Sequence, residues 1–185
     1  IRLRDHSVRF RVPRQAVKEG IVYVTEDRKL DGFFETMTIA ENLHMGAMTA
    51  GLNKGMIVSL TEMQELAAQW TKTLNIRAIN TNAKVIELSG GNQQKVVISK
   101  SLVQKPKIII FDEPTRGVDV GAIAEIHQFI NKLADEGLAI VVISSYLPEV
   151  LNLSDRILVC RSGRVVEEFS PEEATEEKIM FAAVH

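Results

Sequence analysis

The chain has 185 residues, a formal net charge of −2 at pH 7 and one cysteine, Cys160. This length suffices for one domain, alone or with a small subdomain, and the charge leaves no electrostatic footprint for nucleic acid or anionic lipid. A single cysteine excludes a disulfide framework, and Cys160 ends an apolar run, so we expect a buried strand residue. No apolar stretch reaches the roughly 18 residues of a membrane span, no signal peptide opens the chain, and the four histidines never show metal-ligand spacing.

The first part of the chain predicts short elements of both types. Residues 1–10 alternate apolar and polar positions on either side of a polar turn, which predicts a hairpin. Residues 11–20 predict a short helix that Pro13 opens and a glycine ends. Residues 21–24 are an apolar strand, and residues 26–29 (Glu-Asp-Arg-Lys) form a charged loop at its carboxyl end.

The pattern turns helical between residues 35 and 104, where strand signals vanish. Thr38 precedes a helix with a glutamate three residues on, which is the spacing of a capping box, and Thr61 stands in the same relation to Gln64 in the next helix. Trp70 lies on the apolar stripe of that second helix and is expected in the core. We therefore expect a helical subdomain in this stretch.

The remaining residues return to an α/β pattern. In order they predict a helix over 120–136, a strand over 139–144, a short helix near 148–153, strands over 156–160 and 164–169, and a helix after Thr175. We therefore expect an α/β fold in three parts: an α/β part at 1–34, the helical subdomain at 35–104, and a second α/β part at 105–185.

A glycine loop, defined as residues 88–91, is the first of two motifs that carry chemistry. Its small residues Ser89, Gly90 and Gly91 open a helix, so bare backbone N–H groups lie beside the positive end of the helix dipole. An anion, most naturally a phosphate, is favoured there.

The second motif is an apolar run at 108–111 that ends in the carboxylates of Asp112 and Glu113. A buried parallel strand delivers acids in this way to the carboxyl edge of an α/β sheet, where ligands bind. Each motif alone is common, but the pair in this order, joined by one helix, is specific. At this point the chain resembles the ATP-binding cassette (ABC) ATPases, whose signature loop, Walker B strand and D-loop correspond to residues 88–95, 108–113 and 116–119.

The resemblance implies a P-loop NTPase (RecA-like) nucleotide-binding domain with an inserted helical subdomain, and hydrolysis of ATP with Mg²⁺. It implies that Asp112 holds magnesium through water, that Glu113 is the general base, and that the glycine loop covers the nucleotide of a second cassette. Further nucleotide contacts are implied at Gln93, Glu26, Asp119 and Ser145.

The sequence departs from the family at three places. It has no Gly-x-x-x-x-Gly-Lys-Ser/Thr loop, which in the family lies well upstream of the strand that corresponds to residues 21–24, so we expect an N-terminally truncated domain that is inactive in isolation. Glu26 stands where the family has a glutamine, and Ser145 stands where it has a switch histidine, whose imidazole a serine cannot replace. We therefore interpret the chain's own nucleotide site as degraded and the glycine loop that it donates as intact.

These features narrow the resemblance to the second cassette of bacterial monosaccharide importers of the ribose, galactose, xylose and arabinose type, in which one chain fuses two cassettes. Tyr146, where an acidic residue is more usual, departs from that pattern. The resemblance implies a second cassette, membrane permease subunits and, indirectly, a periplasmic sugar-binding protein as partners, with no nucleic acid. It also implies a peripheral location on the cytoplasmic face of the inner membrane.

Three alternatives stand beside this interpretation. A DNA-repair or chromosome-organising ATPase carries a similar glycine loop, but after a long coiled coil or a zinc insertion, and the sequence shows neither sustained heptads nor cysteine pairs. A translation-associated cassette protein favours basic linkers, which the sequence lacks. A non-catalytic interaction module stays open, and the residues do not name the sugar.

Overall fold

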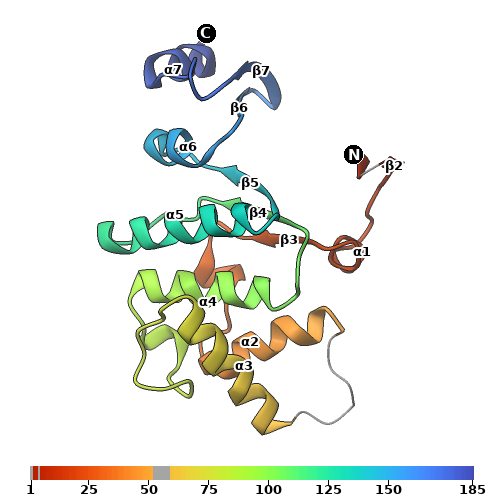
Figure 1. Ribbon diagram of the computed structural model, residues 1–185, viewed down its shortest axis with the longest axis vertical. Helices are drawn as coiled ribbons and strands as arrows, with labels where there is room; N and C mark the ends of the chain where they lie inside the picture. Colours follow the sequence, from red (N-terminus) through yellow and green to blue (C-terminus); the bar gives the residue numbers. More distant parts are fainter. Residues whose placement is uncertain (1, 4, 52–58) are drawn as a thin grey trace. The chain divides into compact units, whose positions relative to one another are not determined.

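The computed structural model describes residues 2–3, 5–51 and 59–185, which form two compact units, Ile1–Val141 and Val142–His185 (Figure 1). The first unit contains the helical stretch and most of the parallel sheet, whose last strand runs across the boundary between the two units. No helix within these described ranges is long and apolar enough to cross a membrane.

The central sheet consists of β3 (Ile21–Val24), β4 (Ile108–Asp112) and β5 (Ala139–Ile143), in the order β3-β4-β5. β3 and β4 run parallel, with Val24 opposite Phe111, and both of these side chains are fully buried. The α/β fold with a parallel sheet is therefore confirmed. The register also brings the residues that follow β3 close to those that follow β4, which is where parallel sheets bind ligands.

Two short elements precede the sheet, both as predicted. β1 (Arg2–Leu3) and β2 (His6–Ser7) pair antiparallel as a hairpin. α1 (Pro13–Lys18) carries a proline in its first turn, where the missing N–H leaves no hydrogen bond unmade. After β3 the charged loop tightens into a π-helical turn, η1 (Arg28–Gly32).

The stretch from 35 to 104 is helical in its described residues, with α2 (Ile39–Thr49), α3 (Leu60–Thr73), the 3₁₀ turn η2 (Val85–Glu87) and α4 (Gly90–Leu102). Thr38 forms the predicted capping box with Glu41. The predicted cap of α3 is wrong: the helix begins at Leu60, so Thr61 already lies inside it, and Ser59 is the cap, accepting from the Glu62 N–H at 3.3 Å. The amide of Gln64 instead donates to Asn82 at 2.8 Å.

α2 packs closely against the carboxyl end of α4. A Cβ added to Gly46 would lie 2.1 Å from the carbonyl oxygen of Lys100, so glycine is required for this contact. The Lys100 ammonium donates to the carbonyl of Gly32 at 2.7 Å and lies 5.2 Å from the centroid of the Phe34 ring. Burial lowers the pKa of Lys100. In α3, Met63 and Ala67 pack with Ala40 of α2, while Trp70 is only half-buried.

Asn42 of α2 holds the segment that leads into this helix. Its fully buried amide accepts a hydrogen bond from the backbone N–H of Phe34 at 2.8 Å. It also donates to the carbonyls of Phe34, Met37 and Thr38 at 3.1, 3.3 and 3.0 Å. All of these hydrogen bonds go to backbone atoms of the segment, so they hold the segment without involving the segment's side chains.

The second unit contains α6 (Leu147–Leu153), the antiparallel pair β6 (Ile157–Arg161) and β7 (Arg164–Phe169), and α7 (Glu176–Val184). Ile157, Val159 and Ile179 form its buried cluster. The expectation that Cys160 is buried is wrong. Alternation along β6 turns Ile157 and Val159 inward, so Cys160 lies on the exposed face as a free thiol.

Candidate functional site

The carboxyl end of β4 carries the two acidic residues that the sequence singled out. The hydroxyl of exposed Tyr23, on neighbouring β3, donates a short hydrogen bond to the Asp112 carboxylate. This bond is the main reason that the pKa of Tyr23 is raised, because losing the phenolic proton would set two negative charges against each other. Asp112 is thus oriented at the surface of the sheet edge, where a hydrated cation can reach it. Carboxylate oxygens beside phosphates and water are the ligands that Mg²⁺ prefers, so the residue fits that ion.

Glu113 has a backbone conformation that side chains rarely adopt. Its φ of +47° lies in the left-handed region, which is disfavoured for residues other than glycine by about 1–3 kcal/mol in most contexts. Such strain is common at functional sites, and the catalytic role implied for Glu113 stays a prediction. The chain then turns twice, with hydrogen bonds from Arg116 N–H to the Glu113 carbonyl and from Val118 N–H to the Thr115 carbonyl, both at 3.1 Å.

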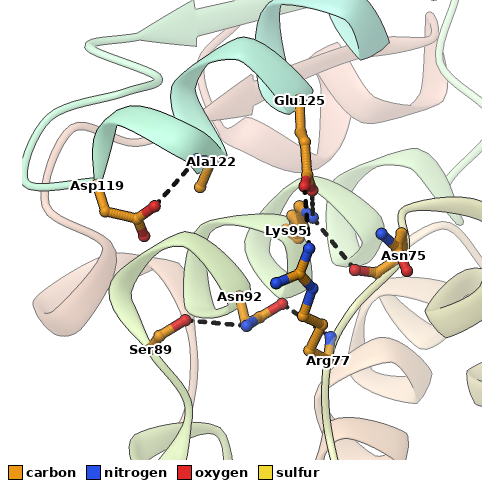
Figure 2. Close-up of polar contacts among 8 residues, drawn as sticks. All are labelled: Asn75, Arg77, Ser89, Asn92, Lys95, Asp119, Ala122 and Glu125. Carbon is orange, nitrogen blue, oxygen red and sulfur yellow. Dashed lines mark hydrogen bonds and ion pairs between the residues drawn. The ribbon is translucent and has the colours of Figure 1, made fainter.

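Asp119 ends this stretch and begins α5 (Val120–Asp135). Its carboxylate caps the helix by accepting from the Ala122 N–H at 3.0 Å (Figure 2). The role implied for Asp119 in nucleotide binding stays a prediction, beside this structural one.

The glycine loop leads into α4 without a side-chain cap. Ser89 is the N-cap residue, yet its hydroxyl accepts from the Asn92 amide at 2.9 Å and does not bond to the helix backbone. The side-chain oxygen of Asn92 (Oδ1) in turn accepts a hydrogen bond from the backbone N–H of Arg77 at 2.8 Å (Figure 2). The first-turn N–H groups of α4 are therefore not satisfied by the Ser89 side chain. This arrangement suits an anion that supplies the missing acceptor.

Close packing explains why both of these loop positions are glycines. A Cβ on Gly91 would lie 2.4 Å from the Cβ of Ala122 in α5, which prevents any larger residue there without movement. A Cβ on Gly90 would lie 2.9 Å from the Gly117 carbonyl oxygen and 3.0 Å from Nη2 of Arg28. The glycine loop therefore packs directly on the 116–119 turn of the same chain, a contact that no pattern in the sequence indicates.

A second polar cluster lies one turn further along α4 (Figure 2). The Lys95 ammonium, on a side chain only 6% exposed, pairs with Glu125 of α5 and donates to the Asn75 carbonyl at 3.2 Å. Arg77 adds a weaker contact to Glu125 at 3.4 Å. The Lys95 hydrogen bond is the main cause that lowers the pKa of Glu125. Sequence reasoning missed this cluster, whose only signal was a lysine within an otherwise buried helix.

Arg28 is the third polar centre of the site. In the sequence it stands out only as one of the four charged residues of the 26–29 loop. Its guanidinium donates from Nη1 to the Arg116 carbonyl at 2.6 Å, from Nη2 to the Gly117 carbonyl at 3.0 Å, and from Nε to the Gln93 amide oxygen at 3.4 Å. The Arg116 side chain reaches back to pair with Glu26. A cavity of about 350 Å³ is lined by residues 26–29, 116 and 117.

Two implied nucleotide contacts have other neighbours in the structure. Gln93 is buried, and its amide nitrogen donates to the carbonyls of Leu88 at 3.0 Å and Ile86 at 3.4 Å, so the side chain braces the glycine loop from inside. Ser145 lies exposed in the second unit, just before α6, where the neighbouring Ser144 hydroxyl accepts from the Tyr146 N–H at 3.0 Å. Their roles toward nucleotide stay predictions.

Comparison with known proteins decides the family. The family model described as "ABC transporter" matches residues 1–116, more than half of the chain. The chain belongs to the ABC transporter family. Among solved ABC structures, the ATP-binding cassette MJ1267 superposes with a TM-score of 0.74 at 26% identity, over 95% of this chain and 72% of that one. The dimeric cassette MJ0796 bound to ADP and Pi gives 0.71 at 25% identity, over 86% and 66%. The P-loop NTPase cassette fold is thereby confirmed.

Curated relatives within the ABC family are sugar import proteins. The chain is 45% identical over 184 residues to the ribose import ATP-binding protein RbsA of Caldanaerobacter subterraneus, covering 100% of this chain and 37% of that protein. It is 49% identical over 177 residues to the xylose import ATP-binding protein XylG of Geobacillus kaustophilus, covering 96% and 35%. The chain thus spans little more than a third of the length of these relatives.

Proposed function

We propose that this chain is a cassette of the ATP-binding subunit of an ABC-type sugar importer, which couples ATP binding and hydrolysis to transport. The likeness to ribose and xylose import proteins over essentially the whole chain is the observation that carries the proposal. The uncapped first turn of α4 and the paired acids after β4 support it, since both suit a bound nucleoside triphosphate with Mg²⁺.

In this proposal the chain contributes to two nucleotide sites. The glycine loop donates backbone N–H groups and the Ser89 hydroxyl toward the γ-phosphate held by a second cassette, as preorganised donors for the charge that develops there. At the chain's own site, Asp112 would hold Mg²⁺ through water, and Glu113 would polarise the attacking water. Magnesium, when bound, neutralises phosphate charge. Because Ser145 lacks an imidazole and Glu26 replaces a glutamine, the chain's main contribution is to the second cassette's site.

The surface toward a membrane permease is assigned to the segment after β3, residues 26–34, together with the helices α2 and α3. Leu30 is 80% exposed and Phe34 is also exposed, so apolar side chains stand at the surface beside the charged Lys29. Arg28, by contrast, is occupied by the 116–119 turn. The protein would then be peripheral on the cytoplasmic face of the inner membrane, with a periplasmic sugar-binding protein as an indirect partner.

ATP turnover of the assembled full-length transporter tests the asymmetry between the two sites. Ser89→Ala removes one charge-assisted hydrogen bond and should slow turnover about ten- to a hundredfold, if that bond forms in the transition state. Gly90→Asp should be near dead, because it sets a carboxylate against both the γ-phosphate and the Gly117 carbonyl. Glu113→Gln should stay largely active, since it acts on the degraded site.

The reverse pattern would overturn this assignment. If Glu113→Gln abolishes turnover while Ser89→Ala and Gly90→Asp are tolerated, the chain hydrolyses its own ATP. If none of the three changes turnover, the chain is a non-catalytic interaction module, the second candidate function.

A further inference from the structure

We infer that Arg28 is a positioning residue: its guanidinium holds the glycine loop and the 116–119 turn in register, so the segment after β3 sets where the glycine loop points. The inference rests on the proposed function, in which that loop reaches the nucleotide of a second cassette. The contacts themselves lie within one compact unit and within described residues.

The geometry of the guanidinium makes this clamp directional. Two N–H groups on one side of the planar fork reach consecutive carbonyls, at 2.6 Å to Arg116 and 3.0 Å to Gly117. The third, Nε, faces Gln93, whose own amide is bonded to the carbonyl of Leu88 in the glycine loop. One side chain therefore links both segments, and a lysine, with a single compact ammonium, cannot reproduce the fork.

The backbone around Arg28 is fixed by its neighbours. The Asp27 carboxylate accepts from the N–H groups of Lys29 and Leu30 at 3.0 and 3.1 Å, which closes the turn that presents Arg28. Glu26 pairs with the side chain of Arg116 while Arg28 bonds its carbonyl, so residue 116 is held from both sides. Gly90 completes the arrangement, because a Cβ there would meet both Nη2 of Arg28 and the Gly117 carbonyl.

The three hydrogen bonds of Arg28 go to Gln93 and to the carbonyls of Arg116 and Gly117, so we expect its effect on the reaction to pass through the loop that it positions. Replacing it should therefore lower kcat for ATP more than it raises KM. It should also loosen the glycine loop and the 116–119 turn together, although these segments lie far apart in the sequence.

The experiment measures hydrogen exchange by mass spectrometry and steady-state ATP turnover on the full-length protein assembled with its permease. Arg28→Ala removes the clamp, and Arg28→Lys keeps the charge without the fork, in case the alanine variant folds poorly. Arg14→Ala, on the exposed face of α1, is the matched control for loss of an arginine. The reporting amides are those of Gln93 and Val118, which are hydrogen-bonded to the Ser89 and Thr115 carbonyls.

In both Arg28 variants we expect hydrogen exchange at residues 88–93 and 116–119 to accelerate about tenfold, because one to two charge-assisted hydrogen bonds are lost. We expect kcat to fall to a similar extent, with KM nearly unchanged. Peptides from α3 and from β6 and β7 should be unaffected, as should the Arg14→Ala protein. Unchanged exchange at either loop, or an equal rise in every peptide, overturns the inference, because a clamp loosens both segments and nothing else.

Turnover separates this inference from the proposed function. If exchange rises at both loops but kcat does not fall, Arg28 does not position the loop for the reaction, and the inference is overturned. If Ser89→Ala measured alongside still slows turnover, the proposed function stands in that case. If Ser89→Ala has no effect either, the proposed function fails as well.

Discussion

The two ends of α4 are built on different principles. At the carboxyl end, Ile98 and Leu102 are buried and the helix backbone lies against Gly46 of α2, so apolar packing and close backbone contact stabilise the fold. At the amino end, hydrogen bonds from Asn92 and Gln93 hold the glycine loop, and Arg28 bonds Gln93 in turn, while Ser89 itself is exposed.

One end of α4 thus stabilises the fold, while the other end orients the glycine loop. Apolar burial and close packing resist change, because a displaced atom has nowhere to go. Hydrogen bonds to surface loops fix direction while permitting small shifts at modest free-energy change. Substitutions at the carboxyl end should therefore act on folding, and substitutions of the loop residues Ser89 and Gly90 at the amino end should act on function. Three substitutions test this contrast.

Gly46→Ala should have the largest effect on folding. Its Cβ would lie 2.1 Å from the Lys100 carbonyl, an atom in the buried last turn of α4 that cannot easily move aside. We expect a loss of about 3 kcal/mol in the free energy of unfolding, the upper part of the range for overpacking, measured by chemical denaturation. Gly121→Ala is the matched control: it meets only Asp119 at 3.5 Å, and should leave stability equal or slightly higher. Similar losses in the two variants would contradict the packing argument.

Glu125→Gln should have an intermediate effect, because it leaves the ammonium of Lys95, on a side chain only 6% exposed, without its carboxylate. Breaking a buried pair is strongly destabilising, but Glu125 is 37% exposed and screened by solvent, so we expect about 1 kcal/mol at pH 7. Glu136→Gln, in the exposed pair with Lys132 at 3.8 Å, is the control and should change nothing measurable.

The effect of Glu125 should also depend on pH in a defined direction. Its pKa in the folded protein lies below the ordinary value of 4.5, so the pair contributes stability that is fully present above pH 4.5. That stability is lost as the pH falls through the lower, folded-state pKa. The difference in unfolding free energy between wild type and Glu125→Gln should therefore shrink on acidification below pH 4.5. A difference that stays constant or grows would show that the ion pair is not its source.

Gly90→Ala should have the smallest effect on folding. Its Cβ would approach the Gly117 carbonyl at 2.9 Å, but this carbonyl belongs to an exposed turn that can shift, and alanine favours the helix. We expect stability to change by about 0.5 kcal/mol or less, while ATP turnover of the assembled protein falls clearly. A large loss of stability with normal turnover would show that the amino end of α4, like its carboxyl end, serves the stability of the fold.

Much of the fold was predictable from local signals. Pro13, the Thr38 capping box and the apolar run of β4 each contain their information within a few residues, so α1, α2 and the parallel strand were predicted correctly. Cys160 was misplaced because an apolar run does not reveal which alternating face is covered. Ser59 was missed because two hydroxyl residues lie within three positions and either can cap.

The motifs of the candidate site are visible in the sequence, but the contacts of their residues are not. Glycines before a helix and acids at the end of a strand can be read directly, and their roles toward nucleotide stay predictions. The bonds from Arg28 reach backbone carbonyls of Arg116 and Gly117, and a carbonyl is the same at every position, so no pattern indicates it. The pairing of Lys95 with Glu125 likewise depends on how α4 and α5 cross.

The way in which Asn42 holds the segment before α2 has a consequence for how such a protein can diverge. Every bond from its amide goes to backbone atoms of Phe34, Met37 and Thr38, so the segment keeps its course whatever side chains it carries. Exposed positions such as Phe34 and Glu35 are therefore open to exchange over evolution. One buried asparagine would let a lineage refit this surface to a different neighbour by single mutations, without redesigning the domain beneath it.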